Sequence, residues 1–441
     1  MRQIVFRSLC LVVMVVFAVS PGNAQTKLSD PNELAPEASI LELVTSVEVG
    51  GIPEMIVVDH AGGRNDVAFY DHGSSNLKFM DADSMVIHDE LHIATWAWIG
   101  WMQYDRYFHR IFFVSTRSQY NPAYWEEARI HVIENHVEII PALSVNKSYN
   151  YGLTNPPDHY YKLHGVVLEQ PYTEGSNPAR LILDNNLNGM VDVVDLNPTG
   201  DGIALKQRAS YRAPLGDPPW NNHAGTSLAL ETNHETLGVD DLATTDILYN
   251  SDANYTKGHL HVMRINHPLQ PLGAVNLPDV DFSGTQPFGN PQSDIQMAAP
   301  RDRLYIANPV QWFENGYLGK LNTTNNTFNA ISFIYGDAGI VHVDWYDTNR
   351  MFVTTCDGFS YDPLKGRYLR FLYNDIVVDS LKLVDNCYES NNEVRDMVFD
   401  PYVRKLYLTM GTKIWVIRVN YGAFAPYDGL TPRLWFPVVI H

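Results

Sequence analysis

A unit of strand, turn and strand recurs along the chain, and this repeat restricts the fold more than any other feature. Each copy has an apolar strand, a turn with Asp, Glu, Asn or Pro and often a basic residue, and a second strand rich in β-branched or aromatic residues, as in "SDIQMAAPRDRLYIAN". The seven copies begin at residues 52, 98, 163, 223, 293, 339 and 394. A third and a fourth strand follow most copies, and no amphipathic helical stretch interrupts the series.

Seven units of four strands predict an all-β chain, folded as a seven-bladed β-propeller of four-stranded antiparallel blades. We assign residues 40–441 to this single domain. Residues 40–49 form a strand ahead of the first unit, and we expect this N-terminal strand to close the ring by pairing with the last blade. The turns resemble the YVTN-type propeller repeats of secreted bacterial proteins in "RLYIAN" and "RKLYLTM", which implies the fold and not an activity.

The N-terminus has the features of a secretory signal peptide over residues 1–24: two early arginines, an apolar run and a small-residue ending at Ala24. Residues 25–39 are then the N-terminal segment of a chain that we expect to be secreted or periplasmic. The formal net charge of −19 argues against a nucleic-acid or an anionic-membrane partner. We expect a monomer that binds an acidic polysaccharide or another extracellular glycan and needs no organic cofactor.

Two cysteines, Cys356 and Cys387, remain once the signal peptide with Cys10 is removed. In an oxidising compartment such a pair most often forms a disulfide, and we favour this pairing. A zinc site is an alternative, because His342 and Asp344 share one face of the strand that leads towards Cys356. Two free thiols are the third alternative.

The positions at which the first strands of the units begin are expected to form a shared site. First strands of propeller blades start at one common face, so side chains at these positions converge there, as a ligand site requires. The strand-start positions hold Glu54, Trp98, His164, His223, Asp294, Gly339, and Glu393 with Arg395. Propeller faces are polar without catalysis and loop histidines are common, so a plain surface role is the competing interpretation.

His164 and His223 are the strongest catalytic candidates, because they precede the strands of neighbouring units at matching places. Histidine exchanges a proton near neutral pH. Tyr161 and Arg212, from the loops before these histidines, add a phenol for proton transfer and a guanidinium that can hold a carboxylate. The residues expected to contact a ligand are Trp98, Tyr160, Trp220, Asn222, Asp294, Glu393 and Arg395.

A calcium site is predicted in the stretch "DNNLNGMVDVVD", which resembles the calcium loops of dockerins and of calcium-binding hairpin repeats. Oxygen-bearing side chains stand at the ligand positions of such a loop, with a glycine at its sharp turn. They are Asp184, Asn186, Asn188, Asp192 and Asp195. Asp195 stands where a bidentate Glu is usual, and a plain Asn-Gly hairpin turn is the competing explanation.

The favoured function is that of a polysaccharide lyase, which cleaves a uronate-containing glycan by β-elimination. This reaction needs a base, an acid and a group that neutralises the uronate. A histidine, a tyrosine, and Arg212 or calcium would fill these roles. The arrangement resembles the secreted seven-bladed ulvan lyases, in architecture and without an aligned motif, and this resemblance also implies structural metals.

Two other functions compete with the lyase. One is a non-catalytic propeller that binds a glycan, a peptide or another envelope protein, because the sequence has no Gly-X-Ser-X-Gly, His-Glu-X-X-His or phosphate-loop motif. The other is a calcium-dependent hydrolase of the lactonase kind, in which Glu54, Asp294 and Glu393 would hold the metal.

Overall fold

Nearly every described element of the computed structural model is a β-strand, apart from the short helix η5 (Ser390–Asn392). Within the described residues, no helix is long and apolar enough to cross a membrane. The structure describes residues 39–60, 63–93, 97–99, 102–105, 109–117, 128–145, 163–168, 180–185, 190–196, 203–210, 224–231, 245–254, 257–266, 275–276, 280–281, 295–298, 303–308, 317–323, 327–331, 336–344, 347–357, 366–387 and 389–420.

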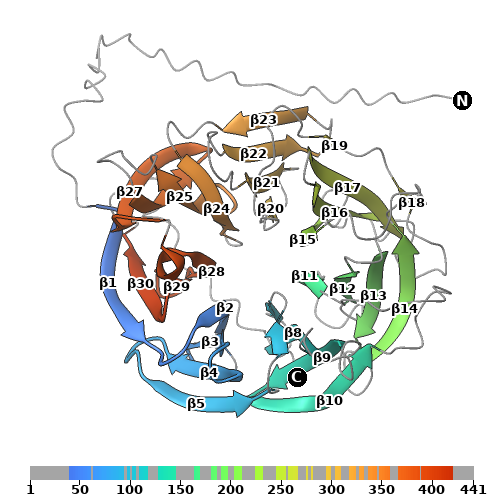
Figure 1. The fold of residues 1–441 in the computed structure, drawn as a ribbon, viewed down its shortest axis with the longest axis horizontal. Coiled ribbons are helices and arrows are strands. Elements are labelled where there is room, and N and C mark those ends of the chain that lie inside the picture. The colour runs from blue at the N-terminus through green and yellow to red at the C-terminus, as the bar shows by residue number, and fades with distance from the viewer. Residues whose placement is uncertain are drawn as a thin grey trace, which may run out of the picture. The chain divides into compact units, whose positions relative to one another are not determined.

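The described strands form seven antiparallel sheets, and the predicted all-β fold of four-stranded antiparallel units is confirmed (Figure 1). The first three sheets consist of β2 (Pro53–Asp59), β3 (Asp66–Asp71), β4 (Asn76–Asp81) and β5 (Ile87–His92); of β6 (Ala97–Ile99), β7 (Gln103–Asp105), β8 (Arg110–Arg117), β9 (Ala128–Glu134) and β10 (Val137–Val145); and of β11 (Leu163–Leu168), β12 (Arg180–Asn185), β13 (Met190–Leu196) and β14 (Ile203–Ser210).

The other four sheets follow the same plan, and the last one includes a strand from the N-terminal end. They consist of β15 (Ala224–Glu231), β16 (Thr245–Asn254), β17 (Lys257–Asn266), β18 (Val275–Asn276) and β19 (Val280–Asp281); of β20 (Ile295–Ala298), β21 (Arg303–Asn308), β22 (Tyr317–Asn322) and β23 (Thr327–Ile331); of β24 (Gly336–Val343), β25 (Arg350–Asp357), β26 (Gly366–Tyr373) and β27 (Ile376–Val384); and of β28 (Val394–Asp400), β29 (Lys405–Met410), β30 (Lys413–Val419) and β1 (Leu41–Glu48). Two sheets have a split strand position, because β6 and β7 both pair with β8, and β18 and β19 both pair with β17.

The first strands of successive sheets touch one another (Figure 1). Contacts run from β2 through β7, β11, β15, β20 and β24 to β28, and β28 in turn contacts β2. Each of the seven repeated sequence units supplies the first two strand positions of one sheet. The starts of all these first strands therefore belong to one end of the sheets, which we call the strand-start face.

Strand β1 joins the two ends of the chain. It pairs antiparallel with β30, from Leu41 opposite Val419 to Glu48 opposite Lys413. Leu41 is 1% exposed and packs in the core shared by the last two sheets. Its backbone N–H also donates to Asp379 of β27 at 2.7 Å, so that the strand is fixed to both sheets.

Successive residues of one strand pack against two different sheets. In β3, Val67 and Phe69 belong to the core shared with the last sheet, whereas Ala68 and Tyr70 belong to the core shared with the second sheet. All four are fully buried. Because side chains alternate between the two faces of a strand, a sheet with a neighbour on each side is apolar at consecutive positions.

Charged contacts also join neighbouring sheets, at a recurrent place. The turn between the third and fourth strands of the sixth sheet consists of Asn374 and Asp375, both at positive φ, as in a tight hairpin turn. Asp375 accepts a hydrogen bond from Tyr305 at 2.5 Å, and it pairs with Lys320 and, at 3.4 Å, with Arg303 of the fifth sheet. Burial opposes the charged form, but Lys320 and Tyr305 outweigh it and lower the pKa of Asp375.

The same place is used between other sheets, with the charges exchanged. Arg303 is the first residue of the second strand of its sheet, and the first residues of the corresponding strands β3 and β29 are Asp66 and Lys405. Asp66 lies 3.1 Å from His136, in the β9–β10 turn of the next sheet. Lys405 donates to the Ala82 carbonyl at 2.6 Å, in the β4–β5 turn of the first sheet. We call these three contacts the inter-sheet clasps.

Replacing Asp375 by Ala is expected to lower the free energy of unfolding by about 2 kcal/mol, because two cations and a phenol lose their shared partner in a half-buried place. Urea denaturation monitored by fluorescence measures this change. The matched control is Asp385→Ala, which removes an ion pair to Lys382 from a carboxylate that is 94% exposed, and we expect no measurable change. Equal effects of the two substitutions would contradict the clasp.

Candidate functional site

Three of the residues predicted at strand starts, Glu54, His164 and Arg395, lie at the strand-start face in bulges rather than at strand ends. The register of the first and second strands shifts around Glu54 in β2, around His164 in β11 and around Arg395 in β28. In each case the first strand has one residue more than its partner. A bulge turns a side chain out of the regular alternation, and bulges are frequent beside functional sites.

The strand register corrects the predicted position of Gly339. Strand β24 already begins at Gly336, so Gly339 does not open the strand as predicted, but it lies in the bulge between Ala338 and Val341. A Cβ at Gly339 would lie 3.0 Å from the Thr354 hydroxyl, which accepts a hydrogen bond from the Ile340 backbone at 2.9 Å. The same cap recurs in the last sheet, where Thr409 accepts from the backbone of Asp396.

The register also separates the two candidate histidines. In β15 the extra residue lies between Gly225 and Ser227, so Thr226 stands at the place that His164 has in β11. His223 precedes β15 and lies outside the described residues. The prediction that the two histidines occupy equivalent positions is therefore wrong, because the bulge position is not visible in the sequence.

The first and last sheets together form the part of this face that the structure describes in full. We define this junction site as Glu54, His72, Glu393 and Arg395. His72 Nδ1 lies 3.6 Å from Glu54 Oε1, and the two side chains are 34% and 17% exposed. Arg395 donates to the carbonyl of Gly411 at 3.1 Å. The sheets are joined beside the site, because Thr409 donates to the Glu54 carbonyl and Asp396 accepts from the Ile56 backbone.

Neighbouring charges shift the pKa of His72 in the junction site. The Glu54 carboxylate raises the pKa of His72 above 6.5, although desolvation and the positive charge of Arg395 act in the opposite direction. Sequence reasoning missed His72, which follows β3. The end of β3 lies beside the start of β2 in an antiparallel pair, and this rule would have identified the residue.

The turn that carries His72 is fixed by Asp71. Its carboxylate accepts hydrogen bonds from the backbones of Ile52 and Gly73 at 2.9 and 3.0 Å, and it pairs with Lys78 at 2.7 Å. A Cβ at Gly51 would overlap the Asp71 carboxylate, so only glycine fits there. The histidine therefore stands on a rigid support, which a preorganised site requires.

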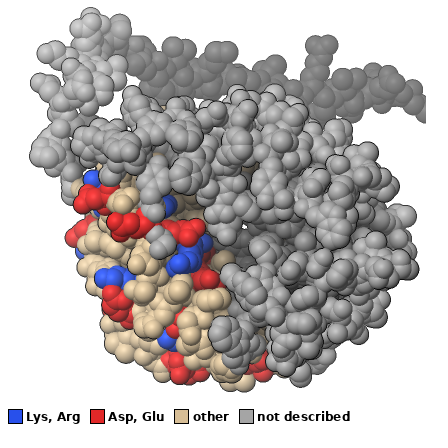
Figure 2. All heavy atoms as spheres, viewed as in Figure 1, with Lys and Arg blue, Asp and Glu red and all other residues tan. Residues whose placement is uncertain are grey.

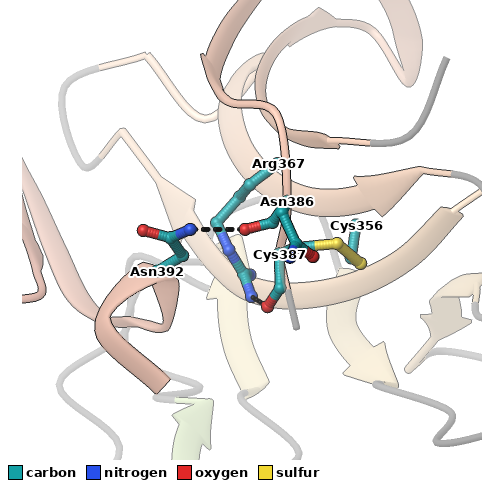
Figure 3. The surroundings of a disulfide bond; sticks show 5 residues. All are labelled: Cys356, Arg367, Asn386, Cys387 and Asn392. Carbon is teal, nitrogen blue, oxygen red and sulfur yellow. Dashed lines mark hydrogen bonds between the residues drawn. A yellow bond between two sulfur atoms is a disulfide. The ribbon is translucent and has the colours of Figure 1, made fainter. Parts of the chain in front are cut away.

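A disulfide ties the segment before η5 to the sixth sheet (Figure 3). Cys356 at the end of β25 is bonded to Cys387, in the segment that leads through η5 to Glu393, with the two Cα atoms 5.8 Å apart. Arg367 donates to the Cys387 carbonyl at 3.2 Å, and the Asn392 amide donates to the carbonyl of Asn386. The disulfide is the pairing that the sequence favoured.

The zinc alternative is wrong for the residues it named. Cys356 is already bonded in the disulfide. His342 stands opposite Phe352, and Cys356 lies four residues further along β25, so that His342 and Cys356 are about 13 Å apart along the strand. His342 accepts a hydrogen bond from the Phe399 backbone at 3.2 Å, and Asp344 pairs with Arg350 at 3.1 Å. No group of three or more His, Cys, Asp or Glu that could hold a metal occurs among the described residues.

The predicted calcium loop is a β-hairpin. Strands β12 and β13 pair with Asp184 opposite Val191 and Asp195 opposite Arg180. Asp195 therefore lies four residues along the hairpin from Asp184, or about 13 Å, and a twelve-residue wrap around one ion is not formed. The register contradicts that loop and favours the hairpin alternative. Asn186 and Asn188, in the connection, lie outside the described residues.

Several other predicted residues lie outside the described part of the chain, or only their backbone is described. His164 and Trp98 are placed by strands β11 and β6. The predicted site residues outside the described ranges are Tyr160, Tyr161, Arg212, Trp220, Asn222, His223 and Asp294.

One hydrogen-bonded array has the connectivity of a catalytic triad, and its burial assigns it another role. Ser115 Oγ lies 2.7 Å from His131 Nε2, and His131 Nδ1 lies 2.8 Å from Glu138 Oε1. A nucleophile must reach its substrate, but Ser115 is 3% and His131 2% exposed. The array connects β8, β9 and β10 and stabilises the second sheet.

No protein-family model matches the chain, and no curated protein matches it in sequence. Solved structures with a similar fold include virginiamycin B lyase from Staphylococcus aureus, at 11% identity and a TM-score of 0.51 over 86% of this chain and 100% of that chain. BBS1N in complex with ARL6DN gives 12% identity and a TM-score of 0.51 over 87% and 98%. A chain of the mitotic checkpoint complex gives 10% and 0.51 over 93% and 99%. At these identities the likeness shows the fold alone, which is that of a β-propeller.

His342 is expected to make stability depend on pH, because burial lowers its pKa from 6.5 to about 4. Between these values the unfolded chain binds a proton that the folded chain does not, so the free energy of unfolding falls as the pH falls. The loss is at most about 3 kcal/mol. Urea denaturation at a series of pH values measures it. His342→Gln keeps an acceptor for the Phe399 backbone and should flatten the profile, and an unchanged profile would contradict the assignment.

Proposed function

We propose that this protein is a secreted carbohydrate-active propeller that cleaves a uronate-containing glycan by β-elimination at the strand-start face. The observation that carries the proposal is the shared bulge, which puts ionisable residues from different sheets at one end of the fold. Glu54 and Arg395 stand there on adjacent sheets, and the backbone of β11 puts His164 at the equivalent position. Strands β11 and β15 are in contact, and we take His223, which precedes β15 in the sequence, as the other candidate base.

The proposed chemistry is a proton transfer followed by loss of a leaving oxygen. His164, or His223 from the next sheet, removes the proton at the carbon beside the uronate carboxylate. The carbon–oxygen bond to the leaving sugar breaks as the double bond forms, and Tyr161 donates a proton to that oxygen. Arg212 neutralises the carboxylate, which stabilises the charge that develops in the transition state. Trp98, Tyr160, Trp220, Asn222 and Asp294 are the proposed sugar contacts.

A second candidate is a propeller that binds the glycan without cleaving it. It is favoured by the charged side chains of the described junction site, where Glu54 lies beside His72 and Arg395 has donors to spare. The described junction site can recognise charge without any further chemistry. Elimination products separate the two candidates, because a binding protein releases the glycan unchanged.

Incubation with a panel of uronate polysaccharides is expected to raise the ultraviolet absorbance of an unsaturated uronate. Replacing the base, by His164→Ala or His223→Ala, should lower the rate at least about a hundredfold while binding remains measurable. His92→Ala, on the outer strand β5, is the control and should leave the rate unchanged. A flat absorbance trace with retained binding would establish the second candidate, and equal rates for all variants would exclude the histidines as bases.

Export is part of the proposal, and the disulfide supports it, because Cys356 and Cys387 would stay reduced in a cytosol. Mass spectrometry of the protein from its native host should find a mature chain that begins near Gln25, with the two cysteines oxidised. A chain that retains residues 1–24 and carries two free thiols would contradict export.

A further inference from the structure

The junction site has a cation with unused donors. Arg395 hydrogen-bonds to the carbonyl of Gly411, and its other guanidinium N–H groups have no hydrogen-bond partner in the part of the chain that the structure describes. Gly411 has φ +65°, and a Cβ there would lie 2.5 Å from the Asn391 carbonyl. The anchoring carbonyl is therefore held in place by a close contact with η5. A guanidinium fixed at one nitrogen keeps its remaining donors aligned for an acceptor with two oxygens.

A second donor lies beside this arginine. Thr409 joins the Glu54 carbonyl to the backbone of Asp396, the residue after Arg395, and His72 lies 3.6 Å from Glu54. The charge of Arg395 accordingly acts on His72. The groups that face His72 are Glu54 of β2, Arg395 of β28, the neighbouring Asp71, and the Tyr70 ring at 6.4 Å. Asp71 is already paired with Lys78. When His72 is protonated, the junction site therefore has two cationic groups, Arg395 and His72, and two carboxylates, Glu54 and Glu393, of which Glu54 lies beside His72.

Recognition of an anion by this protein has to be local. The net charge is −19, and Figure 2 shows acidic and basic side chains of the described residues intermixed on the surface rather than gathered by sign. At short distances, a pair of donors on rigid supports outweighs the repulsion by the net charge, because salt screens that repulsion beyond about 8 Å. Arg395 is held by Gly411, and His72 is held by the Asp71 turn.

We propose that the junction site is a carboxylate-binding subsite, in which Arg395 and His72 hold one carboxylate of an acidic glycan and Glu54 orients His72. The inference takes its class of ligand, a uronate glycan, from the proposed function. It does not depend on catalysis, because the subsite binds an anion whether or not the glycan is cleaved. His164, the proposed base, belongs to the third sheet and not to the first or the last, so the subsite holds a different sugar unit of the same chain.

Binding of short uronate oligomers tests the subsite. The probes are oligomers of galacturonate, guluronate and glucuronate, each with its methyl ester, which has the same sugars without the charge. Calorimetry should show that the unmodified protein binds at least one acid form more tightly than its ester. Arg395→Gln should weaken binding of that acid about tenfold or more and leave binding of the ester unchanged.

The matched control is Arg418→Gln. Arg418 is 51% exposed on β30 and pairs with Glu42, so its loss removes the same charge away from the site. It should change the affinity for either form less than about twofold. Equal weakening by both substitutions would show a general charge effect and overturn the subsite. Failure of every acid form to bind to the unmodified protein would also overturn it.

The dependence of binding on pH is the second readout. Acid-form binding should strengthen as the pH falls through the raised pKa of His72, because the protonated ring donates to the carboxylate. His72→Gln should remove this dependence while Arg395 keeps part of the affinity. A dependence that is unchanged in His72→Gln would overturn the role of the histidine.

The outcomes separate this inference from the proposed function. Oligomer binding that Arg395→Gln weakens, without any elimination product, would support the subsite and contradict the lyase. Elimination with equal affinities of Arg395→Gln and the unmodified protein would support the lyase and contradict the subsite. Thermal unfolding of each variant identifies loss of fold, and a variant that unfolds is replaced by Arg395→Lys, which keeps the charge but not the two-pronged contact.

Discussion

The structure depends on one constraint: the middle strands are apolar on both faces, so every sheet needs a neighbour on each side. Val67 and Phe69 of β3 are buried against one sheet, and Ala68 and Tyr70 against another. A row of such sheets would leave two apolar faces in water at its ends. Contact between β28 and β2 removes both of them. Because every sheet repeats the same strand order, the first strands also begin at one common face. The site therefore follows from the packing requirement.

Apolar burial drives this assembly, but it is non-directional and does not by itself fix how one sheet is rotated against the next. The inter-sheet clasps supply direction. All three clasps reach the same place on the preceding sheet, but with different partners. Asp375 pairs with two cations, His136 with a carboxylate, and the Ala82 carbonyl accepts from a lysine. Geometry is thus retained while the sign of the charge is free to change. This freedom is visible at the first position of the second strand, which is basic in β21 and β29 but is Asp66 in β3.

The sequence was sufficient to predict the parts of the structure that repeat. Strand order, the N-terminal strand that pairs with β30, and the Cys356–Cys387 pair follow from the spacing of apolar strands and the cysteine count. The zinc ligand set and the joint use of Asp184 and Asp195 as calcium ligands failed for one reason, because both required residues to meet that the strand register holds about 13 Å apart. His72 was missed because its importance comes from Glu54, which is adjacent only after β2 and β3 pair. Register is a property of two strands, and a single sequence displays one strand at a time.

The bulge explains how one fold can present different chemistry at each sheet. Thr354 and Thr409 cap the bulge from the second strand, so the backbone is supported by a residue of the neighbouring strand. The bulged residue itself is then free to differ, and it is Glu54, His164, Gly339 or Arg395 in four of the sheets. Gly339 is the exception in which the cap and the site interfere, because a side chain there would press against the Thr354 hydroxyl. The backbone support and the variable side chain thus reside on different strands of a pair, and the side chain at a bulge can differ between sheets while the backbone stays supported.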